Sequence, residues 1–175
     1  MPAIKPSALE ALMFADDGSV PNNPNLPFLI YRDAIDLTGT PDPETAIESV
    51  FGKNGWGEMW RNGIYEYMHY HSMIHEVMSI ARGRARVIFG GAMGRELDLA
   101  QGDVVVLPAG TGHQSLWVSP DLVVICAYPT RGRYDLCRGS KIEYAKAIET
   151  IPLVPLPITD PAYGEDGPLL RLWHS

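Results

Sequence analysis

Four of the five histidines of the chain lie between residues 69 and 113, in a pattern that suits a metal ion. His69 and His71 are two residues apart, so in a strand their side chains would share one face. Glu76 follows shortly after, and His113 comes after a turn rich in glycine and proline. Three imidazoles and a carboxylate suit Fe, Mn, Ni, Zn or Co. These residues alone make His69, His71, Glu76 and His113 candidate ligands of one divalent transition metal, whereas a His-x-His pair in a strand is by itself more often structural or solvent-facing.

The role of His75 stays open at this stage. Alternation along a strand directs His75 away from Glu76, so we expect it to hydrogen-bond behind the ligands rather than to bind the metal. A bulge in the strand would instead let His75 replace Glu76 or His69 as a ligand.

The two segments that carry these residues resemble the two motifs of the cupin superfamily. The first segment, 63–83, fits G-x5-H-x-H-x4-E-x6-G, and the second, 102–113, fits G-x5-P-x-G-x2-H. The resemblance implies the same ligand set, His69, His71, Glu76 and His113. The second motif usually ends with Asn four residues after its histidine, a position that Trp117 takes here. That Asn is not a metal ligand in cupins, so the substitution affects the shape of the pocket rather than the metal site.

The resemblance extends to the YjlB-like cupins over nearly the whole chain. The stretches that carry it are residues 20–27, the Asn54-Gly-Trp56 turn, the run His69-Tyr-His-Ser72, residues 108–113 and the tail 160–170. It implies an all-β fold, a double-stranded β-helix or jelly-roll barrel with a few peripheral α-helices. We therefore expect residues 1–175 to form a single cupin domain with its barrel core at about 58–130.

Periodicity and turn residues place the elements that would hold the site. A helix is expected at about 43–51, after the N-cap Asp42, and another at about 140–149, capped by Ser140. A helix and a strand both fit residues 7–15, and the prolines predict an extended tail after residue 150 that packs on its own barrel or on a second subunit. The expected strands are 28–32, 64–71, 75–82, 84–89, 95–99, 103–107, 113–118 and 122–128.

Strict alternation predicts which side chains line the pocket beside the metal. Tyr65 and Tyr67 would share the face of His69 and His71. Met78 and Ile80 would lie on the face of Glu76, and Ser115 and Trp117 on that of His113. The predicted lining is therefore aromatic and apolar, as in many ligand pockets. The residues that we assign to it are Tyr65, Tyr67, Met78, Ser115 and Trp117.

Composition excludes several classes of partner. The net charge of -7 argues against nucleic acid and anionic membranes, and no apolar run is long enough to span a bilayer. Cys126 and Cys137 are too few for a disulfide scaffold. With an N-terminus that lacks a signal-peptide pattern, these features predict a cytoplasmic protein. We expect a homodimer, because two-fold pairing is the commonest symmetric assembly.

The predicted ligand set favours, as the first hypothesis, a metal-dependent enzyme of the oxygenase, isomerase or lyase type that acts on a small organic molecule. Tyr65, Tyr67 or His75 could then act as acid or base. A second hypothesis is a cupin that binds a sugar or another small molecule without turnover. Absence of Tyr65, Tyr67 and His75 from the pocket would favour this hypothesis. A metal-free structural module is a third reading, which the complete ligand set disfavours.

Overall fold

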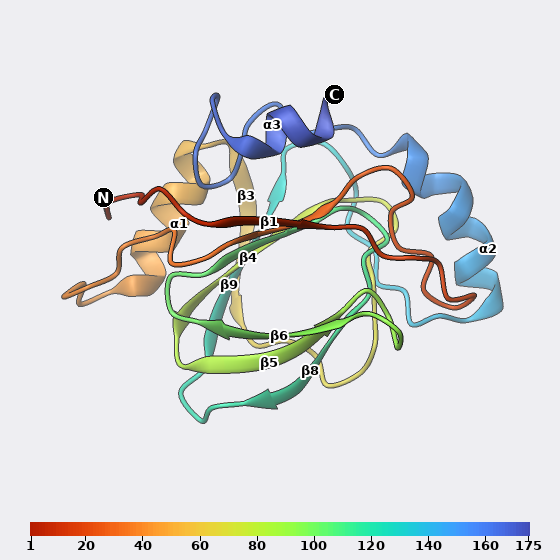
Figure 1. Cartoon of the computed structure of the whole chain (residues 1–175), viewed down its shortest axis with the longest axis horizontal. Coiled ribbons are helices and arrows are strands. Elements are labelled where there is room, and N and C mark those ends of the chain that lie inside the picture. The colour runs from red at the N-terminus through yellow and green to blue at the C-terminus, as the bar shows by residue number, and fades with distance from the viewer.

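The computed structural model describes residues 1–175 and consists mainly of antiparallel strands (Figure 1), which confirms the predicted all-β class. Six strands form one sheet in the order β1-β2-β7-β4-β9-β3, and three form a second in the order β6-β5-β8. The strands are β1 (Leu9–Leu12), β2 (Phe28–Tyr31), β3 (Trp56–Asn62), β4 (Glu76–Arg82), β5 (Arg84–Phe89), β6 (Arg95–Ala100), β7 (Val104–Leu107), β8 (His113–Val118) and β9 (Val123–Pro129).

The space between the two sheets is filled by the inward side chains of both. Met78 and Ile80 of β4 meet Val87 and Phe89 of β5 there, and the same cluster includes Val105 of β7. Alternate positions of β5 are exposed, as expected for a sheet with one wet face. This interior forms the floor beneath the candidate metal site.

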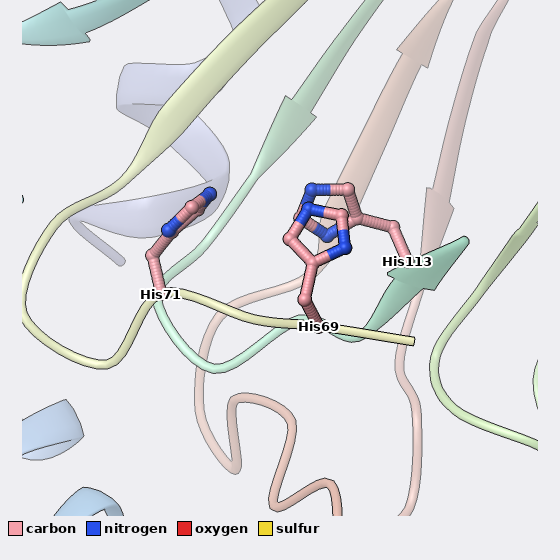
Figure 2. Close-up of side chains that lie close together, drawn as sticks. All are labelled: His69, His71 and His113. Carbon is pink, nitrogen blue, oxygen red and sulfur yellow. The ribbon is translucent and has the colours of Figure 1, made fainter. Parts of the chain in front are cut away.

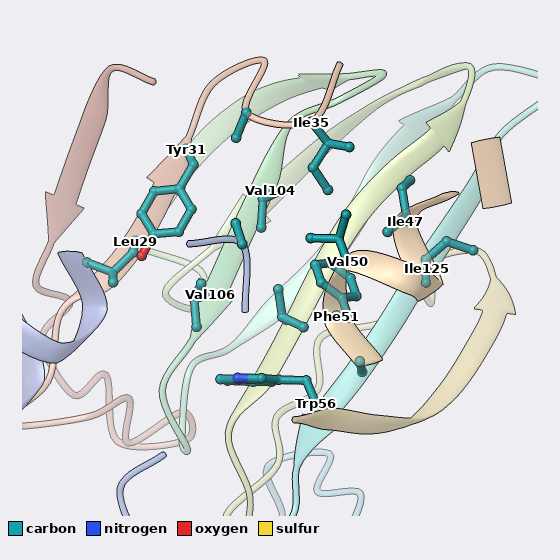
Figure 3. Packing of buried hydrophobic residues seen from close by; sticks show 14 of the residues in the cluster. Leu29, Tyr31, Ile35, Ile47, Val50, Phe51, Trp56, Val104, Val106 and Ile125 are labelled. Atoms are coloured by element: carbon teal, nitrogen blue, oxygen red, sulfur yellow. The ribbon is translucent and has the colours of Figure 1, made fainter. Parts of the chain in front are cut away.

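The outer face of the six-stranded sheet is also buried, because helices cover it (Figure 3). Helix α1 (Pro43–Lys53) packs Ile47, Val50 and Phe51 against Val104 and Ile125 of the sheet. Since both faces of β7 are covered, its sequence is continuously apolar rather than alternating. The predicted N-cap Asp42 accepts a hydrogen bond from the backbone N–H of Thr45.

The segment that carries His69 and His71 is not the strand that we predicted. Residues 64–71 are irregular, and the strand of this region, β3, ends at Asn62. The irregular segment crosses from the six-stranded to the three-stranded sheet, where His69 forms an isolated bridge with His113. The peptide N–H of Ser115 also donates to the carbonyl of Tyr65 at 3.0 Å. A segment that changes sheets cannot keep a regular ladder, although its residues favour one.

The C-terminal region is partly helical rather than extended. Helix α2 (Lys141–Thr150) begins at the predicted cap Ser140, a 3-10 turn follows at Ile151–Leu153, and α3 spans Pro168–Trp173. Pro168 occupies a first-turn position, where proline initiates rather than breaks a helix. Leu169 and Trp173 are buried against the six-stranded sheet, so the tail packs on its own barrel. No helix in the structure is long and apolar enough to cross a membrane.

Candidate metal centre

Three histidines from two distant parts of the chain come together in space (Figure 2). His69 and His71 lie on the irregular segment before β4, and His113 is the first residue of β8. One ring nitrogen from each lies within 4.8 Å of the others, a group that could hold a metal ion. The His69 and His113 rings are closest, with centroids 3.9 Å apart. All three side chains are buried.

Backbone carbonyls fix the orientation and tautomer of all three rings. The Nδ1 atoms of His69, His71 and His113 lie 3.0, 2.5 and 3.0 Å from the carbonyl oxygens of Tyr67, Asp135 and Thr111. A carbonyl oxygen only accepts hydrogen bonds, so each Nδ1 carries the proton and donates it. In the neutral ring each Nε2 is then left with a free lone pair, which is the form that binds a metal.

The turn before His113 depends on glycine at position 110. Gly110 has a φ of 95°, in the left-handed region, and a Cβ there would lie 2.6 Å from the carbonyl oxygen of Asn22. A side chain is therefore excluded on both conformational and steric grounds. The turn carries Thr111, whose carbonyl orients the His113 ring.

Glu76, the first residue of β4, brings a buried carboxylate to the three rings. Its Oε1 accepts a hydrogen bond from the Tyr128 hydroxyl at 3.1 Å. Its Oε2 lies 3.1 Å from Nε2 of His71 and 3.6 Å from Nε2 of His113, yet no group makes a well-directed hydrogen bond to it. A buried carboxylate oxygen that faces imidazole nitrogens and has no well-directed hydrogen bond fits a site for a cation. The donor set of the fold is therefore compatible with the predicted metal.

The protonation of the cluster also suits a cation. Burial would raise the pKa of Glu76, but the adjacent His71, His113 and His69 lower it to about 2. Burial lowers the pKa of His69, and burial together with His69 lowers that of His113 to about 3. Burial also opposes protonation of His71, but the Glu76 carboxylate outweighs it and raises the pKa of that ring. The carboxylate is thus ionised and at least two rings are neutral at physiological pH.

A pocket of about 410 Å³, including its open mouth, leads from the surface to this cluster. Of the residues predicted to line it, Tyr65 and Met78 do so. Trp60, Tyr128 and Tyr134 also line it and were not predicted. The full lining is Trp60, Asn62, Gly63, Ile64, Tyr65, His69, His71, Glu76, Met78, His113, Cys126, Tyr128 and Tyr134.

Trp117 lies outside this pocket, contrary to the prediction. The pairing of β8 with β5 shifts register, so that Ser115 is opposite Val87 whereas Trp117 is opposite Arg86. The extra residue, Leu116, reverses the alternation, because a bulge sends the following side chain to the other face. Trp117 therefore points outward, is 54% exposed, and lines a separate surface depression with Arg86.

Two other predicted lining residues are also displaced from the pocket. Tyr67 stacks on Tyr65, with ring centroids 4.8 Å apart, and lies under the guanidinium of Arg138. Ser115 is buried and its hydroxyl donates to the carbonyl of Ile64 at 2.9 Å. These side chains support the pocket walls from behind.

His75 is buried on the far side of β4 from the pocket, hydrogen-bonded as alternation predicted. Its Nδ1 accepts the backbone N–H of Ala109 at 2.9 Å, and its ring packs on Trp173 with centroids 4.9 Å apart. Burial lowers its pKa to about 3. His75 thus connects the turn before His113 to helix α3 as a neutral ring.

The lining residues that we did not predict differ in whether a sequence pattern indicates them. Tyr128 follows Cys126 by two residues on a predicted strand, so alternation places the two side chains on one face, but Cys126 was itself not predicted to line the pocket. Trp60 precedes the region read as strand, and Tyr134 lies in a loop without periodicity. No sequence pattern indicated either residue.

No protein-family model matches the chain. The chain is 38% identical over 164 residues to the protein named Uncharacterized protein YjlB of Bacillus subtilis (strain 168), covering 94% of this chain and 96% of that protein. A cupin 2 domain-containing protein from Halorhodospira halophila is 14% identical, with a TM-score of 0.36 over 84% of this chain and 79% of its own. Solved structures of the DMSP lyases RdDddP and RnDddQII give 20% identity and a TM-score of 0.37 over 47% of this chain. The chain spans 41% of the lyase chain that it matches.

Proposed function

The chain belongs to the YjlB family of cupins, and we propose that it is a metal-dependent enzyme acting on a small organic molecule. His69, His71, His113 and Glu76 would hold one divalent transition metal through three Nε2 atoms and Oε2. The observation that carries the proposal is the orientation of the three rings. Each donates Nδ1–H to a backbone carbonyl and so offers Nε2 to the ion.

The bound ion would act as a Lewis acid that polarises oxygen atoms of the ligand. The protein side chains perform the other tasks. Tyr128 holds Glu76 through a hydrogen bond, which keeps the carboxylate directed at the histidines. Burial raises the pKa of Tyr134 to about 12, so its phenol stays neutral and can donate a hydrogen bond at the pocket mouth. Tyr65 is the only one of the three acid or base candidates that lines the pocket.

A second candidate is binding of a small molecule without turnover. The pocket holds no carboxylate or ammonium apart from Glu76, so it offers no separate charged acid or base. A pocket with aromatic walls and a metal suffices for binding. Turnover of any ligand that binds the metal-loaded protein distinguishes the two functions, and a ligand recovered unchanged favours binding alone.

Metal content tests the proposed site directly. Protein purified without added metal and then loaded should hold about one ion per chain, and His71→Ala or His113→Ala should lose it, because each removes one direct ligand. His174→Ala is a matched control, since His174 is exposed and its ring hydrogen-bonds only to the carbonyl of Pro157. Full metal content in His71→Ala and His113→Ala would refute the ligand assignment.

A further inference from the structure

Aromatic rings form one wall of the pocket, and two of them are partly exposed to solvent. Trp60 and Tyr134 stack nearly parallel, with centroids 6.1 Å apart and planes at 20°. Both line the pocket, yet Trp60 is 46% and Tyr134 is 38% exposed. Half-exposed aromatic rings contribute little to a core, and rings of this kind are frequent at binding sites.

A bulge in β3 directs Trp60 into the pocket. Gly57 pairs with Tyr128 and Trp60 pairs with Cys126, so β3 carries one residue more than β9 over this stretch. Regular pairing would place Trp60 opposite Ile125, which faces the outer core. Glu58 takes a positive φ of 51° within the bulge, a conformation that is unfavourable for this residue. Strained backbone and bulges that redirect a side chain occur frequently at functional sites.

Tyr134 is held in place from the opposite side by Asp135. The Asp135 carboxylate accepts the backbone N–H groups of Ser72 and Met73 at 2.9 and 3.1 Å and the Ser72 hydroxyl at 2.6 Å. Its carbonyl oxygen is the one that orients His71. Tyr134 consequently lies against the His71 ring, with centroids 5.0 Å apart. The loop that fixes a candidate metal ligand thus also fixes the second aromatic wall.

Charge indicates what the aromatic wall receives. No lysine or arginine lines the pocket, so an anionic group can be balanced only at the metal end. With two positive charges on the ion and one negative charge on Glu76, that end attracts an anionic oxygen chelator. The rest of the ligand meets Trp60, Tyr65, Tyr128 and Tyr134, which favour a flat, uncharged group.

We infer that Trp60 and Tyr134 are the specificity-determining residues of the site, and that the ligand is a small oxygen chelator carrying a planar uncharged group that stacks on them. This inference rests on the proposed function, because it needs an open metal at the base of the pocket. It adds the chemical class of the ligand and the residues that select it.

Two hydroxamates with the same chelating group provide the test. Acetohydroxamate and benzohydroxamate both bind a metal through two oxygens, and only benzohydroxamate carries a planar ring. In Co²⁺-loaded protein of verified metal content, titration followed by the visible spectrum should show that benzohydroxamate binds about tenfold more tightly, a difference of about 1.4 kcal/mol. Trp60→Ala should abolish most of this preference, because it weakens binding of benzohydroxamate in particular.

One control variant and one further test variant complete the experiment. Trp117→Ala removes a similarly exposed tryptophan outside the pocket and should keep the full preference. Tyr134→Leu should reduce it, as Trp60→Ala does. Equal affinity for both hydroxamates, or a preference that survives both Trp60→Ala and Tyr134→Leu, would overturn the inference while leaving the metal site intact. If neither hydroxamate changes the spectrum of loaded wild-type protein, the open metal site itself is wrong and the inference falls with it.

Discussion

At the scale of single residues, Tyr128 supports the candidate metal site without being one of its proposed ligands. Its hydroxyl donates to Oε1 of Glu76 at 3.1 Å, inside a buried environment. Tyr128→Phe should lower metal affinity about 10- to 100-fold, the usual effect of removing a hydrogen bond that orients a ligand. Competition with a chromophoric chelator measures the change. Unaltered affinity would mean that Glu76 does not take part in binding.

His75 should make the metal-free protein sensitive to acid. Its pKa is ordinarily near 6.5 and is lowered to about 3 in the fold, so below about pH 6.5 the unfolded chain binds a proton that the folded chain does not. Its contribution to stability is therefore present above the unfolded pKa and declines as pH falls toward 3. His75→Asn keeps an acceptor near the Ala109 N–H and removes the titration.

The free energy of unfolding of His75→Asn should fall less steeply between pH 6 and pH 4, by up to about 1.4 kcal/mol per pH unit for one proton. Urea titrations of the metal-free protein across this range measure the slope. His113 and His69 keep their own acid sensitivity in the variant, so a residual slope is expected. Identical slopes for variant and wild type would assign the acid sensitivity to other groups.

At the scale of elements, a buried carboxylate holds the C-terminal segment on the barrel. Asp160 is fully buried and accepts hydrogen bonds from the Tyr31 hydroxyl at 2.6 Å and from the N–H groups of Ala162, Tyr163 and Leu169 at 2.9, 2.9 and 3.1 Å. It thereby joins β2 to the turn before α3 and to α3 itself. The prolines of this segment shape it, but Asp160 determines where it docks.

Asp160→Asn should destabilise the protein by about 3 kcal/mol, because it places an amide N–H₂ among hydrogen-bond donors and removes a charge that four donors satisfy. For a chain of this length the melting temperature should fall by roughly 6–12 °C. Asp166→Asn is the control, since Asp166 is exposed and accepts only through its backbone carbonyl. Equal melting temperatures for the two variants would contradict the anchoring role.

At the scale of the whole molecule, we still predict a homodimer. The edge strands β1, β3, β6 and β8 leave backbone groups without a partner, and such edges are commonly covered by another subunit. The tail no longer supports this prediction, because Leu169 and Trp173 are buried within their own chain. Light scattering at micromolar concentration should give twice the mass of one 19.3 kDa chain. A monomer mass would reject the dimer.

The sequence alone determined the all-β class, most strand positions and the group of histidines that the fold brings together. The strand positions follow from local rules, namely period-two alternation and glycine turns. The all-β class and the histidine group follow from the two motifs and the family resemblance that they carry. The strands 84–89 and 113–118 occur where they were predicted. The strand at 64–71 does not, since this segment spans two sheets, and no local rule describes that crossing.

The tertiary structure alone decided the walls of the pocket, and two bulges explain why. One extra residue in β3 turns Trp60 into the pocket, and one in β8 turns Trp117 out of it. Each bulge reverses the alternation after it, so a strict period of two assigns every later side chain to the wrong face. Whether a strand bulges depends on the register of its partner, which is a contact between distant residues and leaves no sign in the local sequence.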